Sequence, residues 1–282
     1  GQQVVMVGGG AVFRSTDGAC GFEAVPIEDE APWYAVSASA WGDRTWLSAT
    51  GSGDDGALLV VGATGAATVV QRWQGDDAFR CDSLRSWAAG DDEGLLAVGA
   101  GPTPTLWRGE GARDAPTTLS WSSEPLDTLP ADTSHVDLRA VTADGDVWVA
   151  VATSEGRALW RGVPATPGPP RALSWSHSVT AAQSLHGPVQ VSGTWAVVRD
   201  GTLETLSASG TWEPVVDVPW TCLQAVEGVA VACELTRALV VTAVEGPEPQ
   251  TEVAFEMAKL LAPLEGCPGD PDGAAACESD WI

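Results

Sequence analysis

The sequence predicts an all-β fold built from a repeated unit of four short strands. The motif LWRG occurs at 106–109 and 159–162, and LSWS occurs at 119–122 and 173–176, so the copies lie 53 and 54 residues apart. Apolar stretches that largely alternate precede each LWRG, and a loop containing glycine and proline separates it from LSWS. This pattern is typical of strands joined by turns. Only AFEMAKLLAPL, at 254–264, reads as a turn or two of helix.

An aromatic residue marks the last strand expected in each unit. These residues are Phe22, Trp73, Trp121, Trp175, Trp212 and Phe255. Their spacings are 51, 48, 54, 37 and 43 residues, with a mean of about 47, the period of a four-stranded propeller blade. The sequence therefore predicts a six-bladed β-propeller of antiparallel blades; seven blades are the alternative if the short fifth unit divides differently.

The two ends of the chain together supply one more period. The segments up to Phe22 and after Phe255 contain 22 and 27 residues, and the first of them offers only three strands. We expect the C-terminal segment ACESDWI to provide the fourth strand of the first blade. Such closure removes two sheet edges that would otherwise invite aggregation. The prediction is one propeller domain spanning 1–282.

Charge restricts the classes of partner. The chain has 38 acidic residues against 14 lysines and arginines, which gives a formal net charge of −24. Repulsion from phosphate groups argues against nucleic acid and against anionic membrane surfaces as partners. No apolar run reaches the ~18 residues of a membrane span, so membrane insertion is not expected. A protein or a glycan remains as the expected partner of a monomer.

The cysteines indicate disulfides. Six are present, none forms a C-x-x-C pair, and the histidines are not spaced as zinc ligands. Cys222 and Cys233 flank a hairpin with Glu227-Gly228 as its two-residue turn, which would place them opposite each other. Cys267 and Cys277 bracket PGDPDGAAA before the closing strand. These two predicted bridges favour an extracellular, periplasmic or cell-surface location. Cys20 and Cys81 have no assigned partner.

The run STDGACGF at 15–22 resembles the Asp-box, whose pattern is Ser-x-Asp-x-Gly-x-Thr-Trp. Ser15 and Asp17 match the first two fixed positions, Gly18 follows, and Phe22 takes the place of the aromatic residue. The chain thus resembles the Asp-box or BNR-repeat propellers, which include sialidase-like enzymes and the Ycf48-like assembly factors of plants and cyanobacteria. The resemblance implies a structural turn between the third and fourth strands of a blade, on the side away from the active site.

The sialidase-like resemblance also implies a Tyr–Glu nucleophile pair late in the chain, and the sequence has no tyrosine there. The only tyrosine is Tyr34, early in the chain, and no F-R-I-P motif is present. Other glycosidases need only two carboxylates in a cleft, so a carbohydrate-active enzyme with its site at the central opening remains the alternative. No catalytic residue is assigned.

Acidic loops are the candidate metal sites. IEDE at 27–30, GSGDDG at 51–56 and GDDAF at 75–79 would share one face of a propeller with GDPDG. Asp54, Asp55, Asp270 and Asp272 are therefore candidate calcium ligands, because Ca²⁺ prefers oxygen donors in flexible loops. No other cofactor is expected. The acidic runs GDDE and ADGD would lie on the opposite face, and acidic residues on both faces instead favour side chains that are simply solvated by water.

His135, His177 and His186 are expected at the surface or in turns. The leading function is a binding or scaffold propeller.

Overall fold

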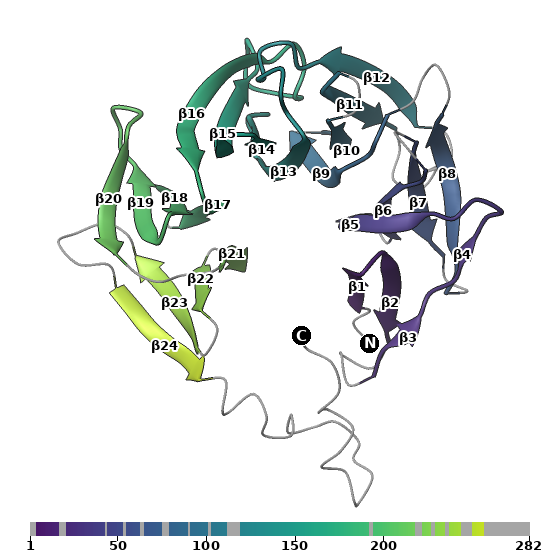
Figure 1. Ribbon diagram of the computed structural model, residues 1–282, viewed down its shortest axis with the longest axis horizontal. Helices are drawn as coiled ribbons and strands as arrows, with labels where there is room; N and C mark the ends of the chain where they lie inside the picture. Colours follow the sequence, from purple (N-terminus) through teal and green to yellow (C-terminus); the bar gives the residue numbers. More distant parts are fainter. Residues whose placement is uncertain are drawn as a thin grey trace, which may run out of the picture. The chain divides into compact units, whose positions relative to one another are not determined.

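The computed structural model describes residues 4–16, 21–42, 44–52, 55–62, 65–74, 79–89, 91–100, 103–111, 119–191, 194–217, 222–226, 229–234, 237–243 and 250–256. The regular elements in these ranges are all β-strands. The chain divides into two compact units, residues 1–181 and 182–282, which are described one at a time. Figure 1 labels the strands of both units.

Unit 1 contains four sheets, numbered here in chain order. Sheet 1 has the order β1 (Val4–Gly8), β2 (Ala11–Ser15) and β3 (Glu23–Ala24). Sheet 2 has the order β4 (Ile27–Glu28), β8 (Ala67–Trp73), β7 (Gly56–Val61), β6 (Arg44–Thr50) and β5 (Tyr34–Trp41). Sheet 3 has the order β12 (Ser120–Pro125), β11 (Thr105–Glu110), β10 (Asp92–Gly99) and β9 (Ser83–Ala89). Sheet 4 has the order β13 (His135–Val141), β14 (Val147–Thr153), β15 (Gly156–Val163) and β16 (Ser174–Ala182).

Unit 2 contains two four-stranded sheets in the described residues. Sheet 5 has the order β17 (Leu185–Val191), β18 (Thr194–Arg199), β19 (Thr202–Leu206) and β20 (Trp212–Asp217). Sheet 6 has the order β21 (Cys222–Val226), β22 (Val229–Glu234), β23 (Arg237–Ala243) and β24 (Gln250–Glu256). The helix expected over 254–264 is wrong for residues 254–256, which belong to β24. The predicted closing strand lies outside the described residues, and the single domain stays a prediction.

Sheet 2 departs from the predicted four strands because it gains β4 along its outer edge. Residues 27–28, expected as part of an acidic loop, pair in parallel with Ala67 and Thr68 of β8. The Ala67 amide donates to the Pro26 carbonyl at 2.9 Å, and Arg72 forms an ion pair with Asp29. We call residues 25–31 the edge strap. It covers hydrogen-bonding groups that an edge strand would otherwise expose.

The predicted aromatic rhythm is confirmed for five of its six residues. The five later aromatic residues lie in β8, β12, β16, β20 and β24, the last strands of their sheets, and Phe22 directly precedes β3. The three strands expected at the N-terminus are also present, and Gly9 and Gly10 form the turn between β1 and β2 with φ angles of 57° and 80°.

The repeated glycine and tryptophan of LWRG and LSWS form one packing unit. Gly109 pairs with Trp121 across β11 and β12, and a Cβ atom on Gly109 would lie 2.8 Å from the Trp121 ring. A Cβ on Gly162 would lie 3.0 Å from the Trp175 ring in the same way. The glycine of one strand therefore leaves the space that the indole of the next strand fills.

The core of unit 1 lies between successive sheets. Both faces of β7 are buried, so its apolar residues contribute alternately to two clusters. Leu59 packs with Val12 and Trp33 of the preceding segments, whereas Leu58 packs with Trp73 and residues of sheet 3. Burial on both faces explains why the sequences of the middle strands are continuously apolar rather than alternating between apolar and polar residues.

Serine side chains join the first strands of sheets 2 and 3. The Leu84 amide of β9 donates to Ser37 Oγ of β5 at 2.9 Å, and the Ser86 amide donates to Ser39 Oγ at 2.8 Å. Ser37 Oγ also lies 2.8 Å from Ser48 Oγ, which is fully buried. These hydroxyls satisfy amides of β9 that have no partner strand on that side.

Replacing Ser37 with alanine is expected to lower the free energy of unfolding by about 2 kcal/mol, because it leaves the buried Leu84 amide without its acceptor. Urea unfolding followed by tryptophan fluorescence measures the change. Ser123→Ala, at an exposed position of β12, is the matched control and should shift stability by less than about 0.5 kcal/mol. Equal effects of the two substitutions would contradict the role assigned to Ser37.

Candidate functional site

A buried carboxylate organises the place where β9 and β13 begin. Asp82 directly precedes β9, and its side chain is only 4% exposed. Arg80 donates to both of its oxygens, at 2.6 and 3.2 Å, and the Ala100 amide donates at 3.0 Å. The Val136 amide of β13 donates at 3.4 Å, and His135 Nδ1 lies 3.5 Å from Asp82 Oδ2. One carboxylate thus links sheet 3 to sheet 4.

The surroundings of Asp82 favour its ionised form. Burial acts to raise the pKa of the Asp82 carboxyl, but hydrogen bonds from His135, Arg80 and the Ala100 amide, together with the His135 charge, outweigh burial. The pKa of Asp82 is therefore lowered. A general acid needs a raised pKa, which Asp82 does not have. Its ionised carboxylate is instead suited to binding the backbone amides and basic side chains around it.

Two arginines on the first strands β9 and β13 lie close to a third arginine on β15. Arg139 of β13 forms an ion pair with Asp137 at 3.1 Å, and Ser83 donates to the other oxygen of Asp137 at 2.8 Å. Arg85 of β9 donates from Nε to the Leu138 carbonyl at 3.2 Å. Arg157 of β15 is near enough for its charge to act on Arg139. We call Arg85, Arg139 and Arg157 the arginine cluster.

The arginine cluster carries more positive charge than its surroundings neutralise. Burial lowers the pKa of Arg139, the charge of Asp137 acts to raise it, and repulsion from Arg157 and Arg85 lowers it further. The net pKa of Arg139 is lowered. Arg85 and Arg157 are exposed, so a ligand can reach them. In a chain with a net charge of −24, this concentration of guanidinium groups favours an anion locally.

The sequence carries a signal for this site that the motif search missed. The pair Leu-Arg occurs at 84–85 and again at 138–139, which is 54 residues apart, the same spacing as the two LSWS motifs. Arg85 and Arg139 are thus equivalent positions of the repeat. His135, His177 and His186 belong to β13, β16 and β17 rather than to turns, and His135 and His177 are exposed, as expected of surface residues.

The predicted calcium ligands are only partly described. Asp55 lies between β6 and β7, where Gln74 Nε2 donates to its carboxylate at 3.4 Å. Asp54, Asp270 and Asp272 lie outside the described residues, so calcium binding stays a prediction. Among the residues that the structure describes, no three histidine, cysteine, aspartate or glutamate side chains gather as a metal site. In the same residues, no helix is long and apolar enough to cross a membrane.

The Asp-box residues are divided in the same way. Ser15 ends β2 and is 1% exposed, and Phe22 is partly buried before β3. Asp17 and Gly18 lie outside the described residues. The motif therefore stands between two strands, as predicted, and the hydrogen bonds expected of Asp17 stay a prediction.

The cysteine predictions have separate outcomes. Cys222 and Cys233 are opposite each other in the backbone register of β21 and β22, and Val226 pairs with Val229. This register is the predicted one, and the disulfide itself stays a prediction. Cys267, Cys277 and Cys20 lie outside the described residues. Cys81 is a free thiol with no exposed surface, and burial raises its pKa.

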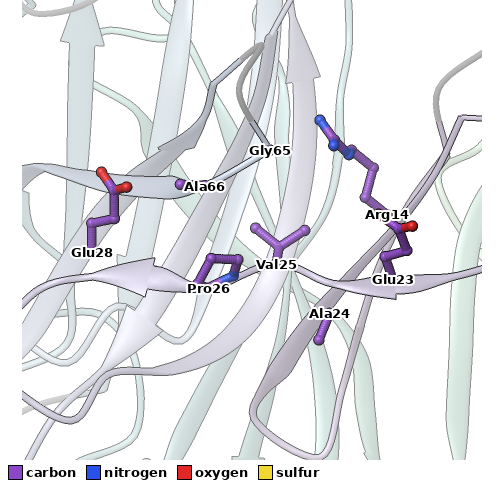
Figure 2. Close-up of a pocket in the computed structure, with 8 residues that line it drawn as sticks. All are labelled: Arg14, Glu23, Ala24, Val25, Pro26, Glu28, Gly65 and Ala66. Carbon is purple, nitrogen blue, oxygen red and sulfur yellow. The ribbon is translucent and has the colours of Figure 1, made fainter.

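Unit 1 also contains two hollows away from the arginine cluster. One, of about 330 Å³, is lined by Trp87, Asp91, Asp92, Glu93, Glu110 and Gly111. Its Glu110 carboxylate already accepts hydrogen bonds from Arg108 and Arg171, at 2.7 Å each. The other, of about 340 Å³, lies between sheet 1 and the edge strap and is shown in Figure 2. Its lining residues are Arg14, Glu23, Ala24, Val25, Pro26, Glu28, Gly65 and Ala66.

Comparison with protein-family models and with curated proteins finds no match. Solved structures do resemble the chain. Ycf48 from Cyanidioschyzon merolae matches with a TM-score of 0.57 and 12% identity, over 86% of this chain and 78% of that one. A candidate 6-phosphogluconolactonase from Bacteroides uniformis matches with a TM-score of 0.55 and 13% identity, over 90% and 80% of the two chains. A puromycin-hydrolysing peptidase from Mycobacterium tuberculosis matches with a TM-score of 0.55 and 12% identity, over 94% of this chain and 43% of that one.

The chain has a β-propeller fold. Two of the three similar structures carry the names of unrelated enzymes. The fold therefore does not say what the arginine cluster does. The chemistry of the residues has to supply that answer.

Proposed function

We propose that this chain is a binding or scaffold propeller that recognises an anionic group of a protein or glycan. The arginine cluster is the observation that supports the proposal. Arg85 and Arg139 lie on neighbouring first strands, and Asp137 is the one acidic side chain within 4 Å of Arg139 among the described residues. Guanidinium groups bind carboxylates and sulfates through paired hydrogen bonds, so several together suit such a ligand.

The proposal includes the finer architecture and the location of the chain. We propose six blades, in agreement with six sheets in the described part of the chain, and closure of the first by the C-terminal segment. We also propose an extracellular, periplasmic or cell-surface location. The opposed positions of Cys222 and Cys233 support a disulfide, and disulfides are characteristic of those compartments.

A glycan array carrying neutral, carboxylated and sulfated glycans tests the ligand, together with an array of acidic peptides. We expect the protein to retain anionic ligands only, more weakly as salt rises. Arg139→Gln should weaken that binding about tenfold, because it removes a charge-assisted pair of hydrogen bonds. Arg139→Lys keeps the positive charge but loses the planar guanidinium, so it separates the contribution of charge to binding from that of hydrogen-bond geometry.

Arg72→Gln is the matched control, because Arg72 is half-exposed and pairs with Asp29 in the edge strap. Its binding should equal that of the wild type. Retention of neutral glycans alone, or unchanged binding by Arg139→Gln, would contradict the proposal. Hydrolysis of a retained glycan would instead support the alternative, a carbohydrate-active enzyme.

A further inference from the structure

The hollow beneath the edge strap contains an arginine that does not pair with its neighbouring glutamate. Arg14 of β2 and Glu23 of β3 are directly opposite in the antiparallel register. Opposite charges in such positions usually attract each other across the ladder. Yet neither side chain forms an ion pair in the described part of the chain, and Figure 2 shows the Arg14 guanidinium directed toward Gly65 instead.

Gly65 makes the room for this guanidinium. A Cβ atom at position 65 would lie 2.4 Å from Arg14 Nη2, and the φ angle of Gly65 is 88°, which disfavours other residues. The Gly65 amide donates to the Gly62 carbonyl at 3.0 Å, which helps to hold the Gly65 backbone in this conformation. The backbone thus holds open the space that Arg14 occupies.

A second charge lies across an apolar wall from Arg14. Glu28 of β4 is exposed, and Figure 2 shows Val25 and Pro26 between Glu28 and Arg14. The wall is fixed because the Val25 amide donates to the Val12 carbonyl at 2.8 Å and the Ala67 amide donates to the Pro26 carbonyl at 2.9 Å. The hollow therefore has Arg14 and Glu23 at one end, Glu28 at the other and an apolar wall between them.

We propose that this hollow binds a small zwitterion of the amino-acid or dipeptide class. Arg14 binds the carboxylate, Glu28 binds the ammonium group, and Val25 and Pro26 contact the carbon chain. A simple carboxylate would face repulsion from Glu23 and Glu28, and a simple amine would face Arg14. A ligand with both charges satisfies both ends, and the volume of about 340 Å³ is ample for a molecule of that size. This site is independent of the anion site proposed for the arginine cluster.

Four probes of matched shape test the site: alanyl-alanine, alanine, N-acetylalanine without an ammonium group, and alaninamide without a carboxylate. Titration calorimetry and amide chemical shifts of the whole chain give the affinities. We expect alanyl-alanine or alanine to bind, and both single-charge probes to bind about tenfold more weakly or less. Shifted amides should lie at Gly65, Ala66 and the edge strap. Equal affinity for N-acetylalanine would overturn the proposal, as would no binding by any probe.

Two substitutions locate the binding. Arg14→Gln and Glu28→Gln should each weaken zwitterion binding about tenfold while leaving the thermal unfolding temperature nearly unchanged, because both side chains lie at least partly in solvent. Glu155→Gln, at an exposed turn of sheet 4, is the matched control and should bind as the wild type does. Binding that persists in Arg14→Gln would overturn the assignment. Arg139→Gln should leave zwitterion binding intact, so the two proposals can fail separately.

Discussion

Replacing Asp82 with alanine is expected to lower the free energy of unfolding by about 3 kcal/mol. The substitution leaves the amide of Ala100 without its acceptor at a buried position and removes the two hydrogen bonds that Arg80 donates to the carboxylate. Buried groups that lose a charged partner cost about 1–3 kcal/mol each. Urea unfolding of the wild type and Asp82→Ala measures the loss, and Asp127→Asn, at an exposed turn, is the control with little expected effect.

The same carboxylate makes stability depend on pH in a defined direction. The native pKa of Asp82 is lowered, so its ionised form stabilises the fold fully above the unfolded pKa of about 3.9. That contribution declines as pH falls through 3.9 toward the lower native pKa. The stability difference between wild type and Asp82→Asn should therefore be constant at neutral pH and shrink below about pH 4. A difference that grew on acidification would contradict the assignment.

Replacing Gly99 with alanine is expected to destabilise the chain by about 3–5 kcal/mol or to prevent folding. A Cβ atom on Gly99 would lie 1.5 Å from the Arg80 carbonyl oxygen and 3.2 Å from the Phe79 ring. The obstacle is backbone rather than a flexible side chain, so the segment before β9 has to move. That segment also carries Asp82, so the displacement would disturb the link between sheets 3 and 4.

Gly8→Ala provides the matched control for Gly99→Ala. Gly8 also lies at the end of a strand, and nothing lies within 4 Å of a Cβ atom placed on it. Its substitution should change stability by less than about 0.5 kcal/mol. Soluble yield, thermal unfolding and urea unfolding of both variants give the comparison. Equal behaviour of Gly8→Ala and Gly99→Ala would show that the close backbone contact at Gly99 is unimportant.

Much of the fold could be predicted because its signals repeat. Trp73, Trp121 and Trp175 each mark the last strand of a sheet, since one packing arrangement recurs along the chain. The edge strap could not be predicted in this way, because Ile27 and Glu28 pair with β8 only once the sheet exists. A two-residue parallel pair leaves no periodic pattern in the sequence.

The candidate site was harder to predict because its residues belong to no recognised functional motif in the sequence. Arg85 and Arg139 belong to a repeat, but a Leu-Arg pair has no recognised chemistry by itself. In the sequence, Asp82 is simply a polar residue before a strand. Its structural role comes from the hydrogen bonds of the Ala100 and Val136 amides, which only the folded chain brings close to it. Tertiary contacts, rather than local pattern, create this site.

The glycine-and-indole arrangement of β11 and β12 has a consequence for how this chain can evolve. Residue 109 can acquire a side chain only if residue 121 gives up volume, and residues 162 and 175 are bound by the same exchange. The two residues of each pair should therefore change together during the evolution of this gene, rather than as two independent positions.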